Sequence, residues 1–331
     1  RYKGPRGAND VAYFTVPDPR EWDAADDKLL QELRDKPGNL FVNGRAEDLA
    51  AVDGSRFAGF TGGPGAEEGM YGHGAVRPLA SLREFDQFVR GWITAGEMVA
   101  ACTRAERMPI LWMSVWLEGA WTRNAFFMPD SNRREPWKPE LFHDDARYIP
   151  PLAPGYAAGA FLEELGRIYE VLRGQQAKLS RAGEWLAAAR KNGKRIWTVA
   201  VGHAYPQILG VKENTKYPIE WGGSVSDLSR SLPADLGAGD VAIHFGYSPV
   251  IHEDLKAIAA RGIKMIYHTP YGRRGLEESE QLLWLDLPWR PTDATVDIPG
   301  YSVRMLPMSS SAHTMAYFAL VAELAERMGW E

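Results

Sequence analysis

The residues that first suggest chemistry in this chain follow a short apolar segment, Ile196–Val201. Its β-branched and apolar composition predicts a buried strand, which ends at Gly202 and is followed by His203 and Ala204. In an open α/β sheet, ligands bind in the crevice at the carboxyl ends of the strands, and glycine lets a bound group approach the backbone closely. We therefore expect this turn to line a ligand site. His203 is the first residue to test there, although a lone histidine can equally be structural.

A second candidate group precedes the last predicted helix, Ala312–Met328. Of Ser309, Ser310 and Ser311, one is expected to be the N-cap, and all three could simply start the helix. The alternative is an anion site, because first-turn amides and the helix dipole favour negative charge and the hydroxyls add donors. His313, in the first turn, would add a proton donor or merely pack.

The histidines do not predict a metal site. His244, His252 and His268 join His203 near predicted strand ends, but no pair has the His-x-x-x-His spacing of a helical metal site. The single cysteine, Cys102, excludes an intrachain disulfide and a cysteine-rich metal site. No metal and no cofactor are expected.

Composition bounds the class of protein. A chain of 331 residues, 45% hydrophobic and 24% charged, can hold two globular domains. A net charge of −5 gives no general attraction to nucleic acid or to anionic membranes, so local groups must hold any anionic ligand. No apolar run approaches the length of a membrane-spanning helix. The sequence starts at Arg1 without a methionine, so export is expected if a signal peptide was removed.

Strands and helices are predicted to alternate twice along the chain. We expect an irregular surface arm over residues 1–20, one domain over 21–160 and another over 161–331. The predicted strands, with the apolar runs that resemble them, are Leu40–Val42, Phe57–Phe60, Phe85–Val89, Ile110–Met113, Ile196–Val201, Tyr217–Trp221, Val241–Phe245, Ile263–His268, Leu282–Leu287 and Tyr301–Leu306. The predicted helices are Trp22–Leu33, Ala95–Arg104, Ala157–Arg190 (divided near Gly174), Glu253–Ala260 and Ala312–Met328. This alternation predicts an α/β fold with parallel sheets.

The two passes through this pattern suggest an internal duplication. Five punctuation points recur in the same order at a nearly constant offset: Gly44 and Gly202, Gly62 and Gly222, Gly91 and Gly246, Ser114 and Thr269, Pro150 and Pro307. We therefore expect a tandem pair of similar three-layer units, the first more diverged than the second.

The second half resembles the SIS (sugar isomerase) family of phosphosugar-binding domains. The matching segments are the helical region Phe161–Gly193 with its Gln175-Gln176 pair, Val201–Ala204, Gly222-Gly223, Gly239–Val241, Ala260–Thr269, Pro291–Ala294 and Pro307–Ser310. The proposed pairing of two such units also resembles the isomerase half of glucosamine-6-phosphate synthase. The resemblance implies a tandem SIS-like αβα fold, a sugar phosphate or other small anion as ligand, a cytoplasmic location and a homodimer.

For the site, the resemblance implies that loops at strand ends hold the ligand. Its substrate-binding residues would be Gly202, Ala204, Gly246, Ser248, Ser309, Ser310, Ser311, His313 and Arg45. An aldose–ketose isomerase of this family needs a carboxylate for proton transfer and often a histidine for ring opening. The candidates are Glu253 or Glu220, with His203.

One departure from the family leaves an alternative open. The phosphate loop after the third strand carries Ser-x-Ser-Gly in the family, whereas this chain has Ile243–Gly246, with Ser248 as the nearest substitute. A non-catalytic member with a sensing, binding or structural role is therefore the alternative to an isomerase. Trp112, Trp116 and Trp121 are expected in the core or at an interface rather than stacked on sugar rings.

Overall fold

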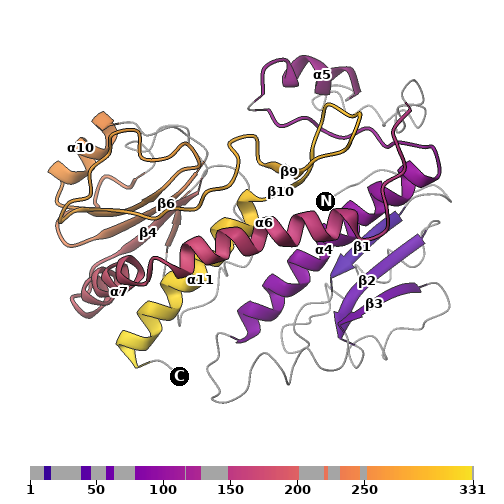
Figure 1. The fold of residues 1–331 in the computed structure, drawn as a ribbon. Helices are drawn as coiled ribbons and strands as arrows, with labels where there is room; N and C mark the ends of the chain where they lie inside the picture. Colours follow the sequence, from indigo (N-terminus) through magenta and orange to yellow (C-terminus); the bar gives the residue numbers. More distant parts are fainter. Residues whose placement is uncertain are drawn as a thin grey trace.

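The computed structural model of the chain describes residues 11–15, 39–45, 57–62, 79–115, 117–127, 148–200, 220–222, 232–246 and 252–329. Within these ranges the strands form a five-stranded sheet, a three-stranded sheet and a two-stranded antiparallel sheet, and long helices run between and beside them (Figure 1). The first two sheets are parallel throughout, so the predicted α/β class is confirmed.

The five-stranded sheet belongs to the second half of the chain and has the order β5-β4-β6-β7-β8. Its strands are β4 (Ile196–Ala200), β5 (Glu220–Gly222), β6 (Val241–Phe245), β7 (Lys264–His268) and β8 (Leu282–Trp284). Ala200 lies opposite Phe245, and Phe245 lies opposite His268. The carboxyl ends of the three central strands therefore meet at one edge of the sheet, where ligands bind in open α/β sheets.

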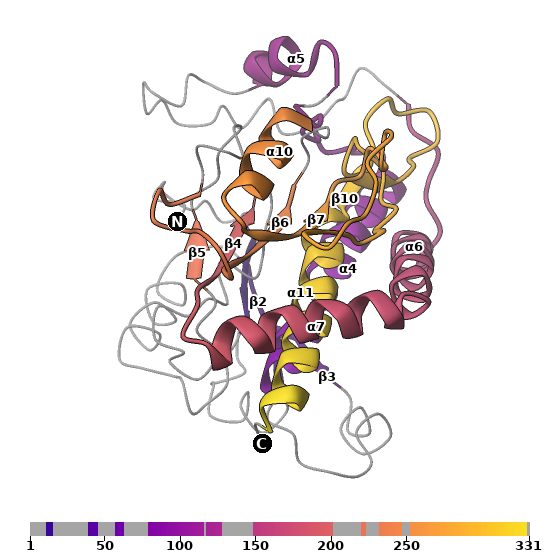
Figure 2. The same ribbon diagram turned by 90° about the vertical axis from the view of Figure 1, so that its left-hand side faces the viewer.

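Helices cover both faces of this sheet. Alternate residues of β6 divide between two apolar clusters, because successive side chains of a strand point to opposite faces. The cluster that contains Ile243 and Phe245 is closed by α7 (Gln176–Lys191) and α11 (Ser309–Met328), and the cluster that contains Ala242 is closed by α10 (His252–Ala260). Figures 1 and 2 show α10 on one side of the strands and α7 with α11 on the other.

The long helical region predicted over residues 157–190 is confirmed as two helices. They are α6 (Tyr156–Arg173) and α7, and Gly174 is the C-cap of the first, as its position predicted. The apolar face read from the sequence is buried throughout: Phe161, Leu165, Ile168, Leu172, Leu179 and Leu186. Burial of one apolar stripe is what fixes both helices against the core.

Helix α6 begins on a carboxylate supplied by another helix, α4 (Leu79–Arg104). Glu97 accepts hydrogen bonds from the amide of Gly155 at 2.9 Å and from the amide of Ala158 at 3.0 Å. Gly155 itself has a φ of 82°, which glycine adopts without strain. Because the N-cap residue offers no side-chain bond, Glu97 acts as the cap and ties two helices together.

Replacing Glu97 by alanine is therefore expected to lower the free energy of unfolding by about 1–2 kcal/mol, the usual loss for a helix cap. Chemical denaturation would measure it. The matched control is Glu163→Ala, an exposed glutamate on the same helix as the capped amides, which is expected to change stability by less than about 0.5 kcal/mol. Equal stability of the two variants would contradict the role given to Glu97.

The first half of the chain forms the three-stranded parallel sheet, in the order β1-β2-β3. Its strands are β1 (Val11–Thr15), β2 (Asn39–Arg45) and β3 (Phe57–Gly62), and α4 packs against it (Figure 1). The runs predicted at 40–42 and 57–60 are confirmed as strands. Residues 1–20 were expected to be an irregular arm, and for Val11–Thr15 this is wrong, because they pair with β2.

Two strands predicted in the first half are wrong. Phe85–Val89 lies inside the 26-residue helix α4, where Val89 and Ala100 join the core. Close packing of this helix is visible at Gly96, where an added Cβ would lie 2.8 Å from Ala157 and from Leu306. Residues 110–113 are irregular. The repeat points at Gly91 and Ser114 therefore do not mark strand ends.

The remaining elements join the two sheets. The short strands β9 (Ala294–Val296) and β10 (Met305–Pro307) pair antiparallel, and α5 (Ala120–Phe127) lies outside the layers (Figure 1). One apolar cluster runs from α4 through α6, α7 and α11 to the five-stranded sheet. No helix in the described ranges has the length and apolar character needed to cross a bilayer.

Candidate functional site at the carboxyl edge of the five-stranded sheet

The first turn of α11 lies at the carboxyl edge of the five-stranded sheet. The His313 ring is 5.3 Å, centroid to centroid, from Phe245 at the end of β6 and 5.5 Å from His268 at the end of β7. Trp289, which follows β8, is also 5.5 Å from His313. The ends of β6 and β7 and the last helix of the chain are thus brought together at this edge.

The start of α11 differs from the prediction in one respect. We expected a serine as N-cap, but Met308 holds that position without a side-chain bond, and Ser309 is the first helical residue. The cap comes from Asp293. Its carboxylate accepts a hydrogen bond from the N–H of Ser309 at 2.8 Å, and its backbone carbonyl accepts one from the N–H of Met308 at 3.0 Å. Asp293 is 4% exposed, so a buried carboxylate already lies at this helix end.

The two serines that follow are almost completely buried, Ser310 at 3% and Ser311 at 0% exposure. Neither hydroxyl has a hydrogen-bond partner in the described structure. Their amides belong to the first turn, which has no intrahelical acceptors, and the regular bonding of the helix starts with the Ala312 amide on the Met308 carbonyl at 2.9 Å. Buried polar groups normally find partners, so these two adjacent hydroxyls, like those of Thr198 and Thr292, are exceptions among the described residues.

His268 is held in one neutral form by its neighbours. The indole N–H of Trp289, which can only donate, bonds Nε2 at 3.1 Å, and Nδ1 lies 3.2 Å from the carbonyl of Leu285. Nε2 is therefore the unprotonated nitrogen and Nδ1 carries the proton. Burial lowers the pKa of His268 to about 3, so the ring is neutral at pH 7.

His244 lies on the other face of the sheet. Its Nδ1 is 3.0 Å from the carbonyl of His268, which requires a proton on Nδ1, and its ring stacks on Tyr267 at 4.5 Å with an interplanar angle of 8°. Burial lowers the pKa of His244 to about 4. Both nitrogens of His268 and Nδ1 of His244 are thus occupied by protein groups, which leaves His268 unable to bind a metal. No set of three or more candidate metal ligands occurs among the described residues.

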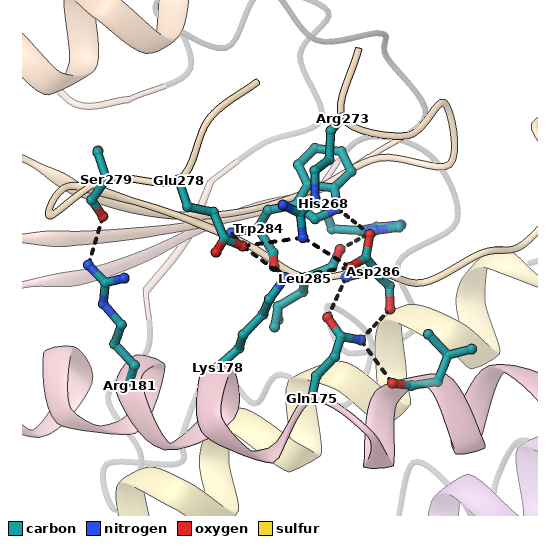
Figure 3. A network of polar contacts seen from close by, with 11 residues as sticks. Gln175, Lys178, Arg181, His268, Arg273, Glu278, Ser279, Trp284, Leu285 and Asp286 are labelled. Carbon is teal, nitrogen blue, oxygen red and sulfur yellow. Dashed lines mark hydrogen bonds and ion pairs between the residues drawn. The ribbon is translucent and has the colours of Figure 1, made fainter. Parts of the chain in front are cut away.

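A polar network holds the segment that carries Trp289 (Figure 3). The side-chain amide of Gln175 makes two hydrogen bonds with the backbone of Asp286. Its oxygen accepts from the Asp286 N–H at 2.8 Å, and its nitrogen donates to the Asp286 carbonyl at 2.8 Å. Lys178 bonds the Trp284 carbonyl at 2.9 Å and pairs with Glu278 at 2.8 Å. The start of α7 therefore fixes β8 and its continuation against the sheet, and with them the donor to His268.

The structure places only part of the predicted site. Gly202, His203, Ala204 and Ser248 lie outside the described residues. Glu220 begins β5 and Arg45 ends β2 in the other sheet, and only their backbones are described. Gly246 follows β6 and is buried, and its chain neighbour Phe245 contacts the ring of His313.

Glu253, the remaining predicted catalytic residue, lies in the first turn of α10 and is exposed. That position suits an acidic residue through the helix dipole alone. The residues that sequence reasoning missed are Trp289 and Asp293, which orient His268 and α11. Asp293 belongs to the segment Pro291–Ala294, whose only signal in the sequence is its family resemblance. No spacing rule connects this residue with the start of a helix that follows β10.

The tryptophans considered for sugar stacking lie outside the core where they are described. Trp112 is 48% and Trp121 72% exposed, so of the two predicted locations, core or interface, the core is wrong for both and an interface stays a prediction; Trp116 lies outside the described residues. The side-chain amide of Asn124 connects the two parts of this segment. Its oxygen accepts from the Met113 N–H at 3.0 Å, and its nitrogen donates to the Met113 carbonyl at 2.8 Å.

Comparison with known proteins bears on the fold. Neither a protein-family model nor a curated protein matches the sequence. Among solved structures, the C-terminal domain of glucosamine-fructose-6-phosphate aminotransferase from Francisella tularensis is similar, with a TM-score of 0.50 and 12% identity. The match covers 99% of this chain and 74% of that one. The fold is α/β and SIS-like. At so low an identity the likeness concerns the SIS-like fold and extends to neither residues nor activity.

Proposed function

We propose that this chain is a phosphosugar-binding protein of SIS type whose ligand lies at the carboxyl edge of the five-stranded sheet. The SIS-like fold supports the class of ligand, since the similar solved structure is named for an enzyme of a hexose phosphate. The ligand edge would combine the Gly202–Ala204 turn, the loop from Gly246 to Ser248 and the first turn of α11.

The observation that carries this proposal is the pair of buried hydroxyls on Ser310 and Ser311 without hydrogen-bond partners in the described structure. Each buried unsatisfied polar group costs about 1–3 kcal/mol. A ligand rich in hydroxyl and phosphate oxygens would supply the missing partners. The two serines lie on the first turn of α11, near the carboxyl ends of β6 and β7, which is the edge where open α/β sheets bind ligands.

Binding without isomerisation is the second candidate function. It is favoured by the end of β6, where the buried apolar side chains of Ile243 and Phe245 stand in place of the family's serines. If the chain is an isomerase, Glu253 or Glu220 would move the proton between adjacent carbons and His203 would open the ring.

A thermal-shift and calorimetric screen with hexose phosphates tests the proposal. A ligand that binds only the folded state raises the free energy of unfolding by about 2.7 kcal/mol at a hundred times its Kd, so a clear rise in Tm is expected for at least one hexose phosphate. Absence of any shift across aldose and ketose phosphates would reject phosphosugar binding.

The same phosphosugar then decides between the two candidate functions. If the bound aldose phosphate is converted to its ketose, Glu253→Gln and Glu220→Gln are expected to retain binding, and the variant that removes the base is expected to lose at least about 100-fold in kcat. Binding without any interconversion, followed by NMR of the sugar, would identify a non-catalytic binding protein.

A further inference from the structure

We infer that Arg274, in the loop between β7 and β8 (residues 269–281), binds the phosphate group of the ligand. This rests on the proposed phosphosugar binding and assigns one further residue to that site. The Ser-x-Ser-Gly phosphate loop of the SIS family is replaced here by Ile243–Gly246, so the charge of a phosphate needs another partner.

The first argument is the place of this loop. It leaves β7 directly after His268, whose ring contacts the first turn of α11. Tyr271 stays close to the strand end, because its N–H donates to Thr269 Oγ1 at 3.4 Å. Farther along, Arg273 reaches Asp286, just beyond the end of β8, at 3.4 Å (Figure 3). The loop therefore lies at the carboxyl ends of β7 and β8, on the edge where open α/β sheets bind ligands.

The second argument is the contrast between the two arginines of the loop. Arg273 is paired with Glu278 at 3.6 Å and with Asp286 at 3.4 Å. Arg274 is exposed, and no carboxylate among the described residues lies within ion-pair distance of its guanidinium. A guanidinium stays charged at any physiological pH, and its planar set of N–H donors matches two phosphate oxygens. Arg274 thus offers a positive charge at the ligand edge.

The third argument is the orientation of this side chain. The guanidinium carbon of Arg274 lies 5.0 Å from the centroid of the Tyr271 ring, a cation–π contact. The ring offers no lone pair to the guanidinium, so the contact orients the arginine and leaves its capacity for charged hydrogen bonds. A side chain that is already oriented loses less freedom when a ligand binds.

The fourth argument is the backbone at this position. Arg274 has a φ of 43°, between Gly272 at 71° and Gly275 at 80°. Glycine adopts such angles freely, whereas the Cβ of arginine makes them strained. The backbone therefore favours glycine, and an exposed side chain adds nothing to the core. Strained residues cluster at ligand sites, and recognition of an anion accounts for an arginine here.

The test uses the full chain, glucose 6-phosphate and inorganic phosphate, with affinities from calorimetry or from displacement. Arg274→Gly is expected to weaken both ligands about tenfold or more, the effect of losing charged hydrogen bonds. Arg274→Lys keeps the charge without the planar donor set and is expected to lose less. The unliganded Arg274→Gly variant is expected to match or exceed the wild-type Tm, because glycine relieves the backbone strain.

Arg190→Ala is the matched control. Arg190 is also an exposed arginine, but it lies in the last turn of α7, shortly before β4 begins at the opposite edge of the sheet. Its replacement changes the net charge by the same amount. Both affinities are expected to stay within about twofold of the wild type, because salt screens exposed charges that lie farther apart than a Debye length.

The outcomes separate the inference from the function. If the wild type binds no hexose phosphate in the screen, the proposed function fails and the inference with it. If the wild type binds glucose 6-phosphate and Arg274→Gly binds it equally well, or Arg190→Ala loses as much, the function stands and the inference is overturned. A loss of glucose 6-phosphate without a loss of inorganic phosphate would place the arginine on the sugar and overturn it. A lower Tm for Arg274→Gly would assign the arginine a structural role and also overturn it.

Discussion

Leucine in place of His268 is expected to destabilise the protein by about 3 kcal/mol, a loss that comes from stranded polar groups. The two side chains are similar in size, so packing contributes little. The indole of Trp289 loses its acceptor on His268, and the buried carbonyl of Leu285 loses the Nδ1 donor. Stranding buried polar groups costs about 1–3 kcal/mol each. Urea unfolding at pH 7 would measure the change.

His268→Gln provides the control, because a glutamine amide carries both a donor and an acceptor. It is expected to recover a large part of the lost stability. If the leucine variant is as stable as the wild type, or if leucine and glutamine lose the same amount, the hydrogen-bonded role of His268 is wrong.

A steep loss of stability on acidification is the second large effect. Burial lowers the pKa of His268 to about 3 and that of His244 to about 4, against about 6.5 in the unfolded chain. As the pH falls below about 6.5, the unfolded chain binds two protons that the native protein does not, so the stabilisation present above that pH is lost progressively down to the native pKa values. At pH 5 each histidine therefore lowers the free energy of unfolding by about 2 kcal/mol relative to its value at neutral pH.

Denaturation from pH 7.5 to pH 5 measures this loss, which is expected to total about 4 kcal/mol for the two histidines. His268→Gln is expected to be less stable at pH 7.5. Its free energy of unfolding should depend less steeply on pH, because unfolding of the variant takes up about one proton fewer. A flat profile in the wild type, or an unchanged slope in the variant, would mean that these rings are accessible to protons in the native state.

Much of the second half could be predicted because its elements are regular and local. The stripe from Phe161 to Leu186 has helical spacing and is buried as expected, and β4, β6 and β7 follow from short apolar runs that end at glycine or threonine. These signals are strong because burial of one face dictates the residue pattern.

The errors arise where distant residues decide the outcome. Phe85–Val89 resembles a strand over a short stretch, but its spacing continues through Val89, Ile93 and Ala100 as one helical face. A serine was expected to cap α11, yet Asp293, far back in the chain, supplies the carboxylate. A short stretch of sequence reveals neither the full helical face of α4 nor the cap that Asp293 provides.

Three expectations stay predictions. The tandem duplication is untested: β2 lies between β1 and β3, and β4 lies between β5 and β6, but β1 precedes the other strands of its sheet whereas β6 follows β4 and β5. The roles of His203 and its turn, and the formation of a homodimer, are likewise untested.

The most direct test of the proposed site is a crystal structure with bound glucose 6-phosphate. We predict the phosphosugar at the carboxyl edge of the five-stranded sheet, with ligand oxygens within hydrogen-bond distance of the Ser310 or Ser311 side chain. A phosphosugar bound elsewhere on the molecule would contradict the proposal.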